Sequence, residues 1–199
     1  MARKQALTDL LTAVHAALEP KATGIAKAAV ERIFTALRTP GEVVESARQP
    51  LSDALAPHLP VALQNAQGPL ATPVSKAFAA LAPQLSWQKR PGSEKNPEFH
   101  ASHANTPIIG PTGELERRDD VIVGAGLMPP NATYPFHSHP PEELYVVLSN
   151  SEWFLEEKGW YRPGIGGVIY HPPRIKHAMR ADDAPLLAVW CLYVEPEDR

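Results

Sequence analysis

The sequence predicts a mainly β protein with an α-helical N-terminal region, in which a small helical bundle precedes a single antiparallel β barrel. Two observations lead to this fold class. In the first half of the chain, apolar residues recur every three or four positions, which is the periodicity of an amphipathic helix. In the second half, short β-branched and aromatic runs alternate with turn-forming residues, and no helical pattern separates them. The expected division is residues 1–95 for the helical region and residues 96–199 for the barrel.

Proline punctuates the helical region, so its helices are expected to be short. The apolar periodicity predicts helices over residues 7–18, 26–37, 52–57, 61–67 and 72–81. Pro20 ends the first of them. In the last, Thr72 is expected to cap the N-terminus while Pro73 occupies the first helical position, where its missing N–H costs little. No polar cluster lies along these segments, so their predicted role is packing.

The second half shows the strand signature, with turn formers such as Asn150-Ser151 between the runs. The clearest expected strands cover residues 121–123, 144–148, 153–155, 168–170 and 186–194. Several short strands without intervening helices favour an antiparallel sandwich or barrel.

Composition narrows the function classes. Nineteen Lys and Arg residues against 22 Asp and Glu residues give a formal net charge of −3, and no basic stripe recurs, so no nucleic-acid partner is expected. The single cysteine, Cys191, cannot form an intramolecular disulfide. No apolar run approaches the ~18 residues that span a bilayer, and the N-terminal segment does not read as a signal peptide. We therefore expect no membrane partner and a cytoplasmic location.

Four of the eight histidines fall within residues 137–177. His137 and His139 are two positions apart, and residues two apart on a strand share a face. Glu143 and Tyr145 keep the same parity if the intervening prolines add no bulge, and the later His177 could complete a site of three nitrogens and one oxygen. Imidazole and carboxylate together suit one divalent transition metal, which could be Zn, Fe(II), Mn, Ni or Co.

The stretch 137–143 resembles the first motif of the cupin superfamily, two histidines one residue apart and a glutamate four further on. The second motif is matched by Pro172 and His177, whereas Arg174 stands where a glycine is usual. The resemblance covers roughly residues 100–199. It implies a single double-stranded β-helix, or jelly-roll, barrel and a metal set of His137, His139, Glu143 and His177.

The surroundings of this motif are similar to those of the bacterial cupin-type dimethylsulfoniopropionate (DMSP) lyases. Helices precede the barrel, Tyr145 follows the expected glutamate ligand by two residues, and Tyr134 precedes the first histidine by three. The resemblance implies a metal-dependent lyase that cleaves DMSP, or a similar β-substituted carboxylate, to dimethyl sulfide and acrylate by β-elimination. It further implies that Tyr145 is the general base and that Tyr134 assists in catalysis and substrate binding.

A sulfonium group is a permanent cation, and aromatic faces attract cations. Trp190 is an expected substrate-binding residue of this kind, and other aromatic candidates in the β half are Phe136, Trp153, Phe154, Tyr161 and Tyr193. Arg174 could bind the substrate carboxylate or simply face solvent. His171 is expected to have a structural role behind the ligands, and His100 and His103 to be structural or solvated.

Two other functions fit the same residues. One is a different metal-dependent cupin enzyme, such as an Fe(II) dioxygenase or an isomerase, because the same ligands support many reactions. The other is a non-catalytic module that binds a small molecule or metal while its helices present a protein surface. Whether the helices cover the barrel mouth or form a homodimer is left open by the sequence.

Overall fold

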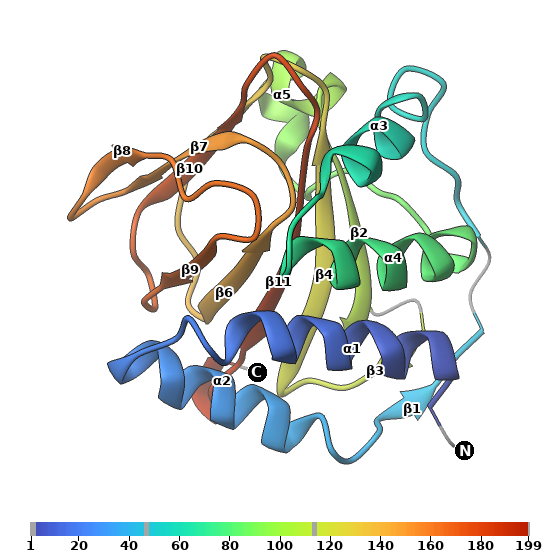
Figure 1. The fold of residues 1–199 in the computed structure, drawn as a ribbon, viewed down its shortest axis with the longest axis vertical. Coiled ribbons are helices and arrows are strands. Elements are labelled where there is room, and N and C mark those ends of the chain that lie inside the picture. Colours follow the sequence, from blue (N-terminus) through green and yellow to red (C-terminus); the bar gives the residue numbers. More distant parts are fainter. Residues whose placement is uncertain (1–2, 46–47, 113–114, 199) are drawn as a thin grey trace.

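The computed structural model describes residues 3–45, 48–112 and 115–198 of the chain (Figure 1). The helices are α1 (Gln5–Leu18), α2 (Gly24–Ala36), α3 (His58–Asn65), α4 (Ala71–Leu81) and α5 (Pro97–Ala101), with short 3-10 turns η1 (Ala82–Gln84), η2 (Ser93–Lys95) and η3 (Pro196–Asp198). The strands are β1 (Glu42–Val43), β2 (Ala104–Gly110), β3 (Glu116–Arg117), β4 (Val121–Met128), β5 (Thr133–His137), β6 (Glu142–Val147), β7 (Ser151–Leu155), β8 (Gly159–Tyr161), β9 (Val168–His171), β10 (His177–Ala181) and β11 (Leu186–Tyr193). None of the described helices is long and apolar enough to cross a membrane.

The strands form two sheets that face each other as a barrel. The larger sheet has the order β1-β3-β2-β4-β11-β6-β9 and the smaller one β5-β10-β7-β8. From β4 onward the chain passes repeatedly between the sheets, so β4, β6, β9 and β11 lie in one and β5, β7, β8 and β10 in the other. The neighbouring strands pair antiparallel except for β2 with β3. This arrangement confirms the predicted jelly-roll barrel preceded by a helical region.

The helices cover the outer face of the larger sheet, as Figure 1 shows for α1, α2 and α4. Helices α1 and α2 contact β6, and α3 contacts β4 and β11. On β6 the side chains alternate between the two sides of the sheet, as a period of two requires. Leu144 and Val146 belong to the apolar core shared with the helices, whereas Tyr145 and Val147 belong to a separate cluster inside the barrel. One strand therefore joins the helical layer to the barrel interior.

Two local expectations are wrong. Residues 52–57 form turns rather than a helix, with hydrogen bonds such as that from the Leu55 N–H to the Ser52 carbonyl. Six residues that end in Pro57 are too few to offset the cost of nucleating a helix. Helix α4 begins at Ala71, and Thr72 does not cap it: the Thr72 hydroxyl accepts a hydrogen bond from the Gly68 N–H at 3.0 Å.

Candidate functional site

The expected metal ligands lie where the chain crosses between the two sheets. His137 is the last residue of β5 in the smaller sheet, His139 lies in the connection, and Glu143 lies on β6 in the larger sheet. His177 begins β10 and pairs directly with His137 across the smaller sheet. The predicted interior face shared by Glu143 and Tyr145 is correct for β6. The two histidines do not continue that strand, however, and they converge on it because the chain changes sheets.

Five side chains contribute donor atoms to this cluster. Three histidine nitrogens lie within 4 Å of Glu143 Oε2: His139 Nε2 at 3.0 Å, His177 Nε2 at 3.6 Å and His171 Nδ1 at 3.8 Å. One donor from each of His137, His139 and His177 lies within 4.8 Å of the others, and the same holds for Glu143, His171 and His177. The two groups share His177, so the cluster could hold one ion with ligands drawn from both.

Three of the histidines are oriented by the same local contact. Each directs Nδ1 at a backbone carbonyl two residues away: His137 at Pro135 (2.8 Å), His139 at Pro141 (2.9 Å) and His177 at Ile175 (2.9 Å). A carbonyl can only accept, so Nδ1 carries the hydrogen and Nε2 remains as the ligand atom, an arrangement usual for metal-binding histidines. Nε2 of His177 is buried without a hydrogen-bond partner among the described residues. These residues fit a divalent transition metal.

His171 differs from these three histidines. It is fully buried, lies directly opposite Glu143 in the pairing of β6 with β9, and has no hydrogen-bond partner on either ring nitrogen among the described residues. Its parity with Ile169 was visible in the sequence, but the inward face of that strand was not. The structure places His171 inside the barrel and next to the expected ligands.

The pKa values favour ligand protonation states suited to a metal. Burial acts to raise the pKa of Glu143, but the hydrogen bond from His139 and the nearby charge of His139 and His171 outweigh it and hold this pKa well below its usual range. Burial lowers the pKa of His137 to about 3 and that of His177 to about 4. Glu143 is therefore ionised and these two imidazoles are neutral near pH 7.

His139 donates a hydrogen bond from Nε2 to Glu143, while its Nδ1 donates to Pro141. Burial acts to lower the pKa of His139, but the hydrogen bond and the charge of Glu143 raise it overall. A proton between Nε2 and the carboxylate satisfies both groups. A metal ion is the other occupant that would do so, because it too is a cation held between a nitrogen and an oxygen donor.

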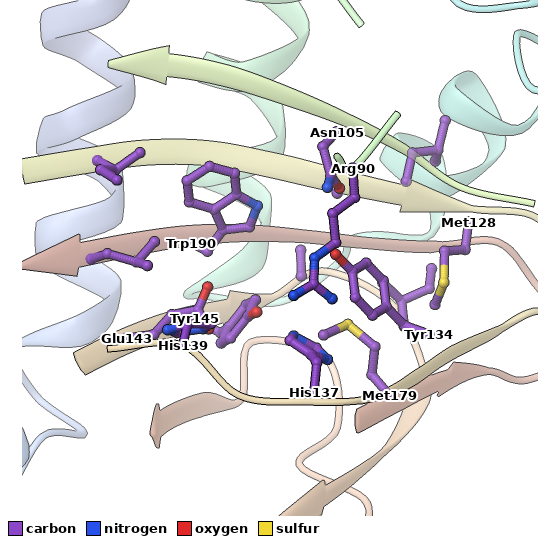
Figure 2. A pocket seen from close by; sticks show the side chains of 16 residues that line it. Arg90, Asn105, Met128, Tyr134, His137, His139, Glu143, Tyr145, Met179 and Trp190 are labelled. Atoms are coloured by element: carbon purple, nitrogen blue, oxygen red, sulfur yellow. The ribbon is translucent and has the colours of Figure 1, made fainter. Parts of the chain in front are cut away.

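A cavity of about 200 Å³ opens beside the ligands. Figure 2 shows His139, Glu143 and Tyr145 together on one side of it, Tyr134, Arg90 and Asn105 on another, and His137 next to Tyr134. Much of the remaining lining is apolar, namely Ile122, Leu127, Met128, Met179, Leu186, Ala188 and Leu192. A mostly apolar cavity with a few convergent polar groups is typical of a small-molecule site, and its volume suits a small metabolite.

The chain matches the model of a known protein family over most of its length. The model of the family described as dimethylsulfoniopropionate lyase matches residues 25–188 of this chain. The chain belongs to the dimethylsulfoniopropionate lyase family. It is 31% identical over 147 residues to dimethylsulfoniopropionate lyase DddQ of Ruegeria pomeroyi, covering 71% of this chain and 72% of that protein. It is 30% identical over 138 residues to putative dimethylsulfoniopropionate lyase DddL of Cereibacter sphaeroides, covering 68% of this chain and 57% of that protein.

Solved structures of DMSP lyases have the same fold. A chain from the crystal structures of DMSP lyases RdDddP and RnDddQII superposes with a TM-score of 0.68 at 23% identity, covering 94% of this chain and 92% of that chain. DddQ from Ruegeria pomeroyi superposes with a TM-score of 0.65 at 24% identity, covering 98% and 94%. The helical region as well as the barrel is thus part of the DMSP lyase fold, and the chain is a lyase of this family.

Two tyrosines of this DMSP lyase family member, which the sequence resemblance implied to be catalytic, lie at the cavity. Tyr145 and Tyr134 both line the cavity, from β6 and β5. Burial and the charge of Glu143 raise the pKa of Tyr145 well above its ordinary value. Burial also raises the pKa of Tyr134, which the charge of Arg90 partly opposes. A cation bound beside Glu143 would act on Tyr145 in the opposite direction and favour its phenolate.

Trp190 also lines the cavity, and the position of its indole depends on Gly124, a residue that the sequence analysis did not single out. Trp190 pairs with Tyr145 on one side of β11 and with Gly124 on the other. A Cβ atom at position 124 would lie 2.3 Å from the indole and 2.6 Å from the Thr106 carbonyl oxygen. Gly124 therefore provides the surface on which the indole lies. Of the aromatic candidates, only Tyr134, Tyr145 and Trp190 are among the described lining residues.

Arg174 lies outside the cavity. Its side chain is 65% exposed and pairs with Asp198 at 2.9 Å, so the expectation that it binds substrate is not supported by its position. Its backbone has a φ of 62°, in the left-handed region that glycine adopts most readily. The turn at residue 174 thus has a backbone conformation typical of glycine, although arginine stands where the second cupin motif usually has a glycine. The Arg174 N–H donates to the His139 carbonyl at 2.9 Å, which joins the two ligand-bearing loops.

Arg90 and Asn105 line the cavity and were missed by the sequence analysis. Arg90 lies before the barrel, between η1 and η2, and Asn105 lies on β2. Neither belongs to a motif, and both are far along the chain from the histidines. Only the packing of the segment before the barrel onto β2 and β5 brings them to the site.

Proposed function

We propose that this chain is a metal-dependent lyase that cleaves DMSP, or a similar β-substituted carboxylate, to dimethyl sulfide and acrylate by β-elimination. Family membership supports the reaction class. The observation that carries the proposal is the position of Tyr145, on the cavity wall and on the same strand face as Glu143. A group able to take a proton therefore adjoins a cluster able to hold a cation.

The proposed ligands are His137, His139, Glu143 and His177, with His171 as a further donor beside them. Their chemistry fits Zn, Fe(II), Mn, Ni or Co. When bound, such an ion would act as a Lewis acid that stabilises negative charge on the substrate carboxylate. The ligand side chains arrive oriented, because the carbonyl contacts of the three imidazoles fix their tautomers before any ion binds.

Tyr145 is the proposed general base. Its phenolate oxygen takes the proton from the carbon next to the carboxylate, and a carbon–carbon double bond forms as the carbon–sulfur bond breaks. The electron pair of that bond leaves with sulfur, so a sulfonium becomes neutral dimethyl sulfide and acrylate remains. A phenol has an ordinary pKa of ~10, so this role requires nearby positive charge that stabilises the anion.

Tyr134 and Trp190 are proposed to bind the remainder of the substrate. Both present aromatic faces to the cavity, and aromatic faces attract a sulfonium cation that has no hydrogen-bond donors. Burial raises the pKa of Tyr134, so its hydroxyl is protonated near neutrality and can donate a hydrogen bond to the substrate. The apolar lining keeps water away from the reacting atoms, which strengthens the electrostatic contacts inside.

The test is release of dimethyl sulfide from DMSP under anaerobic conditions, compared between wild type and Tyr145→Phe at equal metal content. We expect release by the wild type and its loss, by about 100-fold or more, in the variant. Tyr161→Phe is the matched control, because Tyr161 lies on the same barrel but not on the cavity. Full activity in metal-loaded Tyr145→Phe would assign the base elsewhere. Oxygen consumption without dimethyl sulfide release would favour a dioxygenase.

Assembly and location are further proposals. A homodimer formed through the helices and a cytoplasmic location are compatible with the fold. Light scattering on the purified chain would measure the mass in solution, and fractionation of the source cells would give the location.

A further inference from the structure

The cavity contains one positive side chain besides the histidines. Arg90 is the only Lys or Arg among the described residues that line it. In Figure 2 its side chain extends into the cavity beside Tyr134, on the side away from Glu143 and His139. The guanidinium carbon lies 5.5 Å from the centre of the Tyr134 ring. The cavity thus has a cationic group that is separate from the cluster of ligands.

Arg90 makes no ion pair with an acidic side chain of the described residues, whereas Arg3, Arg32, Arg118, Arg162, Arg174 and Arg180 each do. The acidic group in the cavity, Glu143, is bound by His139. A guanidinium presents a planar set of donors that matches a carboxylate. An arginine without an acidic partner in a largely apolar cavity is therefore suited to an anionic ligand.

The backbone of Arg90 is held by a buried histidine. His103 is fully buried, and its Nδ1–H donates to the Phe99 carbonyl at 2.6 Å. Its Nε2 accepts a hydrogen bond from the Arg90 N–H at 2.8 Å. The His103 ring also stacks on Phe99, with ring centres 3.9 Å apart, and Phe99 contacts Tyr134 edge to face. One imidazole thus fixes both the start of the Arg90 side chain and the ring beneath it.

The neighbouring residue, Lys89, holds the same segment in place with two hydrogen bonds from its side chain. Lys89 donates from Nζ to the His103 carbonyl at 2.6 Å and to the Ala101 carbonyl at 3.3 Å. The segment that precedes the barrel is therefore attached to the end of α5 and to the start of β2 at two adjacent residues. An arginine whose backbone is fixed in this way loses less entropy when it binds a ligand.

We propose that Arg90 binds the substrate carboxylate from the side opposite the ligand cluster, so that the carboxylate lies between the guanidinium and the proposed ligands, and that His103 is a positioning residue for Arg90. The ligand class rests on the proposed function, because DMSP carries a carboxylate at one end and a sulfonium at the other. Repulsion between like charges keeps the sulfonium away from the guanidinium and from the face of Tyr134 over which it lies, which leaves Trp190 and the rest of the Tyr134 ring for the sulfonium. Arg90 would thus also set the direction in which the substrate lies. An analogue with an esterified, uncharged carboxyl group would lose this contact.

The main experiment compares metal-loaded wild type, Arg90→Gln and Arg90→Lys. We expect KM for DMSP to rise about 10- to 100-fold in Arg90→Gln, with a smaller rise in Arg90→Lys, which keeps the charge but not the planar donors. We expect kcat to change less than KM, because the carboxylate is bound before and during the reaction. Arg162→Gln is the matched control, since it removes an arginine from the exposed barrel surface.

Binding of propionate gives a readout independent of turnover. Calorimetry on the metal-loaded proteins should show propionate binding to wild type and to Arg162→Gln, and binding weakened about tenfold or more in Arg90→Gln. Unchanged propionate binding together with an unchanged KM in Arg90→Gln would overturn the proposal. If propionate binds in an Arg90-dependent manner but wild type releases no dimethyl sulfide, the carboxylate site stands and the proposed function fails.

The positioning role of His103 is tested by non-additivity. His103→Leu removes the acceptor for the Arg90 N–H and should raise KM several-fold, while His103→Gln, whose amide oxygen can accept, should restore part of the loss. In an Arg90→Gln background, His103→Leu should raise KM clearly less than it does in wild type, because the guanidinium that it positions is gone and only its support of Tyr134 remains. An equal rise in both backgrounds would show that His103 supports the fold and not Arg90.

Discussion

The two sides of the cavity hold their polar groups by different means. On the ligand side, three imidazoles are fixed by carbonyls only two residues away in sequence. On the Arg90 side, the guanidinium comes from a segment before the barrel whose backbone is held by His103, thirteen residues further along the chain. The ligand side is built by local geometry at strand ends. The Arg90 side exists only when the segment before the barrel is packed against β2 and β5.

This difference separates the part of the site that could hold a metal in many reactions from the part that selects the substrate. A cluster of imidazoles and a carboxylate is compatible with many metal-dependent reactions. Arg90, Tyr134 and Trp190 present a cation and two aromatic faces instead, and such groups choose among ligands by charge and shape. We therefore expect substitutions on the ligand side to abolish metal binding and all turnover, and substitutions on the Arg90 side to change substrate affinity while metal is retained.

The largest effect should follow from the loss of a ligand. His177→Ala removes the donor that both groups of the cluster share, so metal affinity and lyase activity should each fall by more than about 100-fold, beyond the usual loss for a residue that only orients a ligand. Competition with a chelator and elemental analysis measure the affinity and the metal content. His58→Ala, on α3, is the control. Retention of one metal ion per chain in His177→Ala would remove His177 from the ligand set.

A substitution of His171 tests whether this residue is a metal ligand like His177 or only supports the ligands. It is as buried as His177, but its ring nitrogens have no hydrogen-bond partner among the described residues, and its Nδ1 lies 3.8 Å from Glu143 Oε2. As a residue behind the ligands it should lower metal affinity by about tenfold when changed to Gln, less than His177→Ala does. Losses of equal size in the two variants would make His171 a ligand of the same rank.

Much of the ligand side was predictable from the sequence, because its residues lie in two short motifs. The spacing of His137, His139 and Glu143 located the cluster, although the assumption of one continuous strand face was incorrect. Arg90 was not predictable, because no pattern links a residue before the barrel to histidines some fifty positions later. Arg174, which is adjacent to a motif, was the more obvious candidate for a carboxylate contact, yet its side chain points to the surface and pairs with Asp198.

The fold, too, was predictable only where the sequence has a regular apolar pattern. Apolar periodicity predicted helices α1, α2 and α4 and the long buried strands, because it directly indicates which face of an element is buried. Strand β5 gave no such signal, because it is an edge strand that contains Pro135 and has no alternating burial. Its position is fixed by its pairing with β10, so it depends on contacts that periodicity does not record.

A second prediction concerns His103 and the pH dependence of stability. Burial lowers the pKa of His103 to about 4, below the ~6.5 of an exposed imidazole. The unfolded chain therefore takes up this proton first as the pH falls, and the free energy of unfolding should decrease between about pH 6.5 and pH 4, by up to about 3 kcal/mol. Above pH 6.5 the imidazole is neutral in both states, so His103 contributes no pH dependence there.

Chemical unfolding of metal-free wild type and His103→Gln at several pH values measures this contribution. The variant should lose stability less steeply below pH 6.5, because Gln does not titrate. His137 and His177 also have lowered pKa values, but they are present in both proteins and cancel in the difference. Parallel pH profiles for the two proteins would show that His103 is protonated as easily in the folded state as in the unfolded state.

The smallest effect is expected at Gly124, which affects the Arg90 side through Trp190. In Gly124→Ala the new methyl group would overlap the indole and the Thr106 carbonyl, so the indole must move toward the cavity that it lines. We expect KM for DMSP to rise about tenfold or less and the free energy of unfolding to fall by about 1–3 kcal/mol, as is usual for an overpacked site. Metal content should stay unchanged, since no ligand contacts this strand position.

A double-mutant cycle with Trp190→Phe distinguishes displacement of the indole from general damage to β4. Phenylalanine lacks the outer indole atoms that lie over Gly124, so Gly124→Ala should raise KM less in the Trp190→Phe background than in wild type. The overlap with the Thr106 carbonyl does not depend on residue 190, so part of the stability loss should remain in both backgrounds. An identical rise in KM in the two backgrounds would mean that Gly124 acts through the strand, and that the position of Trp190 does not set substrate affinity.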